Sequence, residues 1–174
     1  MTAEDALYFE LLLSNGYKDE FEVWLSEQLE KETSLSDPVL ELAFCQSSLR
    51  DTVSVLYNFR IGKHLDIRIL EDKLKSFLSR MYREKKMSSQ EVMDFIEWNL
   101  YAPHMPLWDI PWKENEFAQD IQCLYIIYVD DLELGWISQN EFEYLLGAWL
   151  EDRISVNEAY DRVVERRQQE TIHV

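Results

Sequence analysis

The stretch from Phe117 to Leu150 constrains the fold more than any other part of the chain. It predicts two helices joined by a turn at 135–137, and the first helix contains the run CLYIIYV, which is apolar on every side. A helix that is apolar all round is buried, so we expect the helix at about 117–133 to lie at the centre of the fold. The run is also compatible with a buried strand, since Ile, Tyr and Val favour sheets, but its long context and the lack of a partner strand favour a helix.

The rest of the chain favours an all-α fold. Four glycines and four prolines among 174 residues leave little material for hairpin turns, and 47% hydrophobic residues can supply a sizeable core. We predict a single helical domain spanning residues 1–174, in which about eight helices form antiparallel helix–turn–helix pairs around the buried helix. The helices expected in the first half span residues 2–13, 18–32, 37–61 and 66–85.

A short sequence occurs three times and marks three helix starts. Residues 87–92 (MSSQEV) are repeated as residues 137–142 (ISQNEF) and as residues 154–159 (ISVNEA). In each copy a serine precedes a glutamate by three residues, which predicts a capping box in which each side chain binds the backbone N–H of the other residue. The first two copies also share their later apolar positions, so we interpret them either as an old duplication or as convergence on one helix-start geometry.

A segment rich in proline and tryptophan lies between the first two copies. Residues 98–112 contain three of the four prolines and three of the six tryptophans, so this segment cannot form a regular helix. Long loops of this kind often carry function. We expect Trp108 and Trp112 to form either a packed lid or a recognition surface. The other tryptophans considered, most of which we expect in the core, are Trp24, Trp136 and Trp149.

Negative charge is concentrated in the second half of the chain. The net charge is −17, and residues 87–152 contain fourteen acidic residues and one basic residue, whereas residues 62–86 contain eight basic and four acidic residues. Such a charge repels nucleic acid and anionic membranes and attracts a basic protein. No apolar run approaches the ~18 residues of a membrane span, and acidic residues stand where a signal peptide needs bases. We therefore expect a cytoplasmic protein, with Cys45 and Cys123 as reduced core thiols.

The turn at 130–141 is similar to an EF-hand calcium loop. Its first residue is Asp130, its sixth is a glycine and its twelfth is Glu141, but leucines occupy positions three and five. Calcium requires oxygen ligands at those two positions. We therefore interpret the turn as a helix–turn–helix with a capping box, in which Asp130, Asp131 and Glu133 form a solvated acidic corner.

The sequence contains no catalytic signature. It has no glycine-rich phosphate loop, no Cys-x-x-Cys pair and no nucleophile elbow, and neither His64 nor His104 has a second histidine or a nucleophile nearby. Glu91, Asp94 and Glu97 stand at helical spacing and form an acidic face rather than a metal cage. We expect no enzymatic activity, no metal and no cofactor, with a carboxylate-based enzyme as the weakest alternative.

An acidic surface with aromatic anchors suits a basic protein partner, because rings supply desolvated contacts that charge alone does not. The expected partner-binding residues are Trp108, Asp109, Trp112, Asp130, Asp131 and Glu133. In size, acidity and absence of a catalytic motif, the whole chain resembles the small immunity proteins that protect bacteria from nuclease-type toxins. This resemblance implies an inhibitor that covers a toxin's nucleic-acid site, and it assigns no individual residue. The alternative is a regulatory or scaffolding helical domain with a degenerate EF-hand-like turn.

Overall fold

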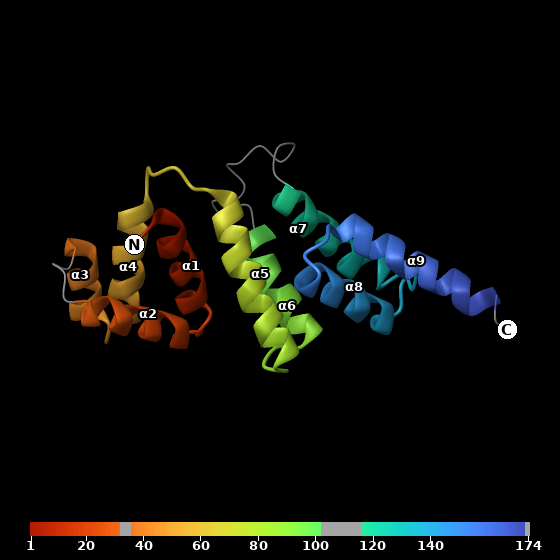
Figure 1. Cartoon of the computed structure of the whole chain (residues 1–174), viewed down its shortest axis with the longest axis horizontal. Helices are drawn as coiled ribbons and strands as arrows, with labels where there is room; N and C mark the ends of the chain where they lie inside the picture. The colour runs from red at the N-terminus through yellow and green to blue at the C-terminus, as the bar shows by residue number, and fades with distance from the viewer. Residues whose placement is uncertain (32–35, 102–115, 173–174) are drawn as a thin grey trace. The chain divides into compact units, whose positions relative to one another are not determined.

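The computed structural model describes residues 1–31, 36–101 and 116–172. Within these ranges the chain forms nine α-helices and two π-helical turns and contains no strand, which confirms the all-α prediction (Figure 1). The chain divides into two compact units, residues 1–73 and 74–174, and the division falls inside one helix, α5 (Ile67–Arg83). The prediction of a single domain stays a prediction.

The first unit contains a helix that is buried on nearly every side, α1 (Ala3–Ser14). Nine of its 12 residues are buried, because apolar side chains surround its axis instead of forming one stripe. Thr2 and Asp5 form a capping box at its start. The other helices of this unit are α2 (Asp19–Glu30), α3 (Asp37–Cys45) and α4 (Leu49–Arg60). Helix α1 packs against α2 and α4, and α3 packs against α2 and α4.

The single helix predicted for residues 37–61 is wrong, because α3 and α4 are separate helices. Pro38 stands in the first turn of α3, as expected. The break follows Cys45, where Ser48 accepts a hydrogen bond from the Asp51 N–H (3.4 Å) and the Thr52 hydroxyl donates to the Cys45 carbonyl (3.0 Å). Serine and threonine side chains offer the backbone an alternative to the helical ladder, so the two side chains end one helix and begin the next.

The second unit contains the end of α5 and four further helices. Helix α6 (Ser89–Ile96) continues into the π-helical turn η1 (Glu97–Tyr101), and α7 (Glu116–Ile126) continues into the π-helical turn η4 (Ile127–Asp131). The last two helices are α8 (Gln139–Glu151) and α9 (Val156–Ile172). Helix α7 packs against η1 and α9, and α8 packs along α9 (Figure 1). None of the helices that the structure describes combines the length and apolar character that a membrane span requires.

The prediction that the helix at 117–133 is buried all round is wrong. Ile127 is buried, but Ile126 is 43% exposed, and Tyr125, Tyr128 and Val129 are half-buried. One side of α7 and η4 faces the core of the second unit, and the other carries apolar and aromatic side chains at the surface. The CLYIIYV run therefore lies at the boundary between the core and the surface. Burial in the core does not explain the apolar side chains on its outer side.

The core positions expected for most of the tryptophans and for both cysteines are found only in part. Trp149 is fully buried, Trp24 is half-buried, and Trp136 is 62% exposed on the turn before α8. Cys45 and Cys123 are free thiols, as expected, but both are half-buried and do not lie in the core.

A buried polar cluster holds the helices of the second unit together. Asp120 of α7 accepts hydrogen bonds from the Trp149 indole N–H (3.0 Å) and from the Val156 backbone N–H (2.9 Å). The Lys75 ammonium lies 3.8 Å from the same carboxylate and 4.9 Å from the Trp149 ring centre. Because buried polar groups are costly unless they are hydrogen-bonded, this carboxylate fixes α7 against α8 and the start of α9.

Candidate functional site

The two best-matched sequence repeats form the same turn. In the first, the N–H groups of Lys86 and Met87 both donate to the Met81 carbonyl, and in the second those of Trp136 and Ile137 both donate to the Asp131 carbonyl. These residues correspond at an offset of 50 positions. The repeat therefore encodes a helix–turn–helix geometry, used once between α5 and α6 and once between η4 and α8.

The two turns also contact each other through equivalent residues. Gln139, the first residue of α8, donates a hydrogen bond of 3.1 Å to the hydroxyl of Ser89, the first residue of α6. A contact between equivalent residues is what a local twofold arrangement produces. The capping boxes of Ser88 with Glu91 and of Ser138 with Glu141 are both complete.

The third predicted capping box is only half formed. The Ser155 hydroxyl accepts a hydrogen bond from the Glu158 N–H (3.2 Å). The Glu158 carboxylate, however, pairs with Arg162 at 3.2 Å, one turn further along α9. This copy still begins a helix, but it does so with the serine half of the motif.

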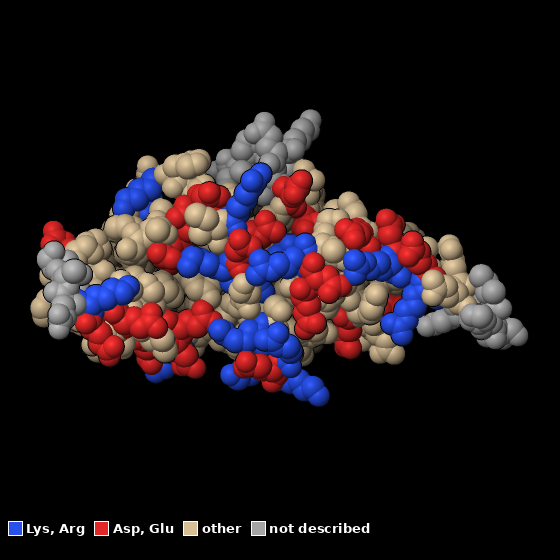
Figure 2. Space-filling view, in the orientation of Figure 1, with Lys and Arg blue, Asp and Glu red and all other residues tan. Residues whose placement is uncertain are grey.

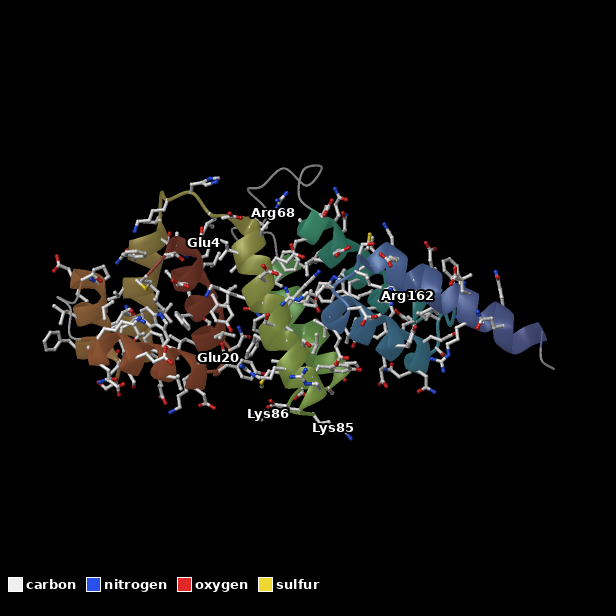
Figure 3. All side chains as sticks on the ribbon, in the orientation of Figure 1. Glu4, Glu20, Arg68, Lys85, Lys86 and Arg162 are labelled. Atoms are coloured by element: carbon white, nitrogen blue, oxygen red, sulfur yellow. The ribbon has the colours of Figure 1, made fainter. Side chains whose placement is uncertain are left out.

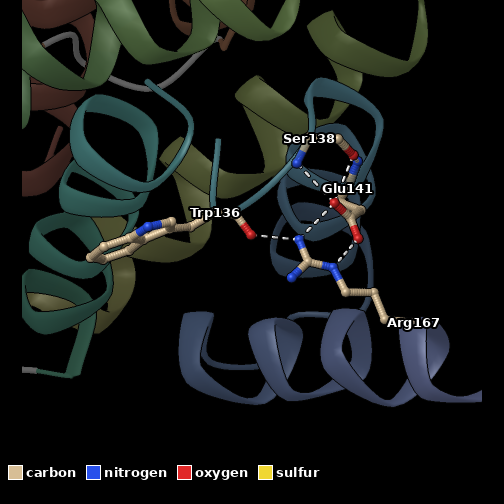
Figure 4. A network of polar contacts seen from close by, with 4 residues as sticks. All are labelled: Trp136, Ser138, Glu141 and Arg167. Carbon is tan, nitrogen blue, oxygen red and sulfur yellow. Dashed lines mark hydrogen bonds and ion pairs between the residues drawn. The ribbon is translucent and has the colours of Figure 1, made fainter. Parts of the chain in front are cut away.

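In the EF-hand-like turn, the carboxylate that would serve as the last calcium ligand is engaged by protein groups. Figure 4 shows Arg167 of α9 donating to both oxygens of Glu141 and, at 2.6 Å, to the Trp136 carbonyl, while the Ser138 N–H and hydroxyl also donate to Glu141. The hydrogen bonds from Arg167, and then those from Ser138, lower the pKa of Glu141 to about 2. Within the described part of the chain, no cluster of three or more acidic, histidine or cysteine side chains could hold a metal ion.

The acidic corner predicted on this turn is present at the surface. Asp130 and Glu133 are exposed and Asp131 is half-buried. Leu134 and Trp136, two large apolar side chains, are each 62% exposed beside them. In Figure 4 the Trp136 ring points away from Arg167. The turn thus presents negative charge and apolar surface together.

A pair of tyrosines, one in the π-helical turn η1 and one in α7, lies next to this corner. Tyr101 of η1 stacks on Tyr125 of α7, with ring centres 4.2 Å apart and ring planes inclined by 19°. The Tyr125 hydroxyl donates to the Glu97 carboxylate at 3.4 Å. Turn η1 has a local cause, since the buried Asn99 side chain donates to the Phe95 carbonyl at 2.7 Å and so competes with the helical ladder. π-Helical turns often occur at functional sites.

Carboxylates of α6, η1 and η4 lie close enough to affect the pKa values of Tyr125 and Tyr128. Burial, and then the negative charges of Glu97 and Asp130, raise the pKa of Tyr125. Burial, and then the charges of Asp94 and Glu97, raise the pKa of Tyr128. We use the name acidic face for the surface that these residues form with the corner. Its members are Asp94, Glu97, Tyr101, Tyr125, Tyr128, Asp130, Asp131 and Glu133.

The carboxylates of the acidic face form no ion pair with a described basic side chain, whereas some other acids of the chain do. Elsewhere Glu10 pairs with Arg60 at 2.6 Å, and Asp152 pairs with Arg162 at 2.7 Å. Among the described residues, none of the five carboxylates of the acidic face lies within ion-pair distance of a basic side chain. Their negative charge is therefore uncompensated within the described structure.

Two other charged regions set the acidic face in context. Lys and Arg side chains gather at the turn between α5 and α6, where Lys85 and Lys86 are labelled (Figures 2 and 3). In the first unit, α2 carries exposed acids along one side, among them Glu27 and Glu30, and Figure 2 shows this red band. The band on α2 lacks the stacked tyrosines of the acidic face.

The sequence and the structure agree on part of this candidate site, and its role in binding stays a prediction. The sequence identified Asp130, Asp131 and Glu133, and it placed Asp94 and Glu97 on one acidic helix face. Trp108, Asp109 and Trp112 lie outside the described residues, so their predicted role stays a prediction. The three tyrosines were missed, because Tyr125 and Tyr128 were assigned to a buried helix. Glu97 follows Asp94 by three residues, and Tyr101 follows Glu97 by four. This helical spacing could have placed Tyr101 on the same helix face as the two acids.

Comparison of the chain with protein-family models, curated proteins and solved structures finds no match.

Proposed function

We propose that the chain is a binding protein that uses the acidic face to neutralise a basic protein partner, in the manner of an immunity protein acting on a nuclease-type toxin. The observation that supports this proposal is the group of five carboxylates that form no ion pair with any described residue and lie beside exposed apolar and aromatic side chains. Charge of one sign steers an oppositely charged partner, and exposed rings supply the apolar anchors that dominate binding energy. A nuclease must be basic where it binds phosphate, so an acidic face matches the surface that inhibition has to cover.

Capture from the native host tests this function. The intact chain and a variant with Asp94→Lys and Asp130→Lys serve as baits, and a variant with Glu27→Lys and Glu30→Lys on α2 is the control, since it changes the net charge equally. We expect the intact chain and the control to retain a basic protein that the acidic-face variant loses. We also expect the isolated partner to cleave nucleic acid and to be inhibited by the chain. Retention of the same partner by all three baits, or a captured partner that is acidic, contradicts the proposal.

The second candidate, a regulatory or scaffolding domain, is favoured by the paired helix–turn–helix repeats and the EF-hand-like turn. Such a domain would respond to an ion or to a second protein. The contacts of Glu141 with Arg167 and Ser138 argue against calcium as that ion, because they occupy the carboxylate that calcium would need.

Calcium distinguishes the two candidates. A ligand raises the thermal unfolding midpoint only if it binds the native state. Because we expect calcium not to bind this turn, ~1 mM calcium should leave the midpoint unchanged. The control is the same titration with magnesium. A midpoint that rises by several degrees with calcium alone favours the regulatory candidate and contradicts the interpretation of the turn as a capped corner.

A further inference from the structure

The stacked pair Tyr101 and Tyr125 places two aromatic rings on the acidic face. The two rings are nearly parallel, and both residues are half-buried, so part of each remains at the surface. The Glu97 carboxylate lies at the edge of the stack, 3.4 Å from the Tyr125 hydroxyl. Planar rings and a carboxylate without an ion pair among the described residues therefore meet at one point.

This combination suits a guanidinium better than an ammonium. A guanidinium is planar, stacks on an aromatic ring and can donate two parallel hydrogen bonds to one carboxylate, whereas an ammonium is a strongly hydrated point charge. The chain contains an example of the stacking geometry on α8, where the Arg166 guanidinium lies 5.2 Å from the ring centre of Tyr144. Cations over aromatic faces are attracted by the charge distribution of the ring.

The charges around the stack add to this preference. Asp130 and Glu97 both act on the Tyr125 phenol, so a cation above this ring is attracted by two carboxylates from separate helices. The two carboxylates also repel each other, and an incoming cation offsets this repulsion. The stack is thus a defined point within a broader negative surface.

We infer that the tyrosine stack receives an arginine side chain of the basic partner, with the guanidinium over the Tyr125 ring and hydrogen-bonded to the Glu97 carboxylate. The inference rests on the proposed function and adds to it the residue type that the partner presents. It predicts that the acidic face attracts basic chains in general through its charge. It also predicts a preference for arginine over lysine that depends on the tyrosine rings.

Binding of acetylated oligoarginine and oligolysine peptides of equal length, measured by calorimetry at about 0.1 M salt, tests the inference. We expect oligoarginine to bind about fivefold more tightly than oligolysine. Tyr125→Leu should abolish this preference, and Tyr125→Phe, which keeps the ring, should retain it. Tyr144→Leu removes an exposed tyrosine on α8 and is the matched control. Circular dichroism confirms that each variant is folded, and Tyr101→Leu provides a second removal of the stack.

The outcomes separate this inference from the proposed function. One outcome is that both peptides bind and that Asp94→Lys with Asp130→Lys weakens the binding of both. If there is then no preference for arginine, or if Tyr125→Leu and Tyr101→Leu leave the preference intact, the tyrosine stack is not an arginine site. The acidic face then remains the proposed binding surface. If neither peptide binds, or if the charge reversal changes nothing, the proposed function and this inference both fail. An arginine preference that disappears with either ring and survives Tyr125→Phe supports the inference.

Discussion

The turn between α5 and α6 and the turn between η4 and α8 share a backbone but present opposite chemistry. Equivalent positions carry Arg80 and Asp130, and Arg83 and Glu133, so the first turn is basic and the second acidic. The positions that the turns share are the buried apolar residue, the capping serine and the glutamate. The repeat therefore specifies the helix starts, whereas the positions between them differ in charge from one turn to the other.

The two turns also differ in how they are anchored. The second is tied to α9 by Arg167, which binds Glu141 and the Trp136 carbonyl, and its preceding helix is tied to α9 by Asp120. In the first turn, the hydrogen bonds that lower the pKa of Glu91 come from Ser88 of its own capping box. A fixed turn presents Trp136 and the acidic corner in one position, which favours binding because less conformational freedom is lost.

The largest expected effect on stability comes from removing the anchor under the second turn. Asp120→Ala should lower the free energy of unfolding by about 3 kcal/mol, because the buried Lys75 ammonium loses a neighbouring carboxylate and two buried N–H donors lose their acceptor. Asp152→Ala is the control, since its ion pair with Arg162 is exposed and should contribute less than about 1 kcal/mol. Urea denaturation measures both. Equal losses for the two variants contradict the structural role assigned to Asp120.

A smaller effect is expected at the Arg167 anchor. Arg167→Leu should cost on the order of 1 kcal/mol at neutral pH, less than the pKa shift alone implies, because Arg167 is partly exposed and solvent screens the pair.

The pH dependence of this effect has a defined sign. The pKa of Glu141 is lowered from 4.5 to about 2 in the folded chain, so the stabilisation is present above pH 4.5 and is lost as the pH falls towards 2. The stability difference between wild type and Arg167→Leu should therefore shrink across that window, as measured by urea denaturation at a series of pH values. A difference that stays constant from pH 7 to pH 2 means that the anchor is not ionic.

The smallest expected effects test the shared backbone itself. Gly135 has a positive φ of 72°, and the equivalent Lys85 has a φ of 56°. Gly135→Ala should cost about 1 kcal/mol from backbone strain alone, since no neighbouring atom would contact the added Cβ. Lys85→Gly should stabilise the chain by about 0.5 kcal/mol for the same reason. Thermal denaturation detects both, and changes of the same sign would show that the turns are not equivalent.

The fold was predictable where local patterns decide it. Capping boxes placed the starts of α6 and α8, and apolar spacing placed the buried stripe of α5. The break at Cys45 was not predictable from periodicity, because the side chains of Ser48 and Thr52 that cause it interrupt an otherwise continuous helical pattern. The outward side of α7 and η4 was missed for a different reason. Hydrophobicity in sequence does not distinguish a buried helix from one whose outer side is an exposed aromatic surface.

The association rate of the captured basic partner tests the role of the acidic face most directly. The measurement compares wild type, Asp94→Lys with Asp130→Lys, and the control Glu27→Lys with Glu30→Lys, each at low and at high salt. We expect reversal on the acidic face to slow association about tenfold at low salt, and high salt to slow wild type and largely remove this difference. The control should stay close to wild type. Association that is indifferent to salt, or that slows equally for both reversed variants, contradicts the claim that the acidic face is the binding surface.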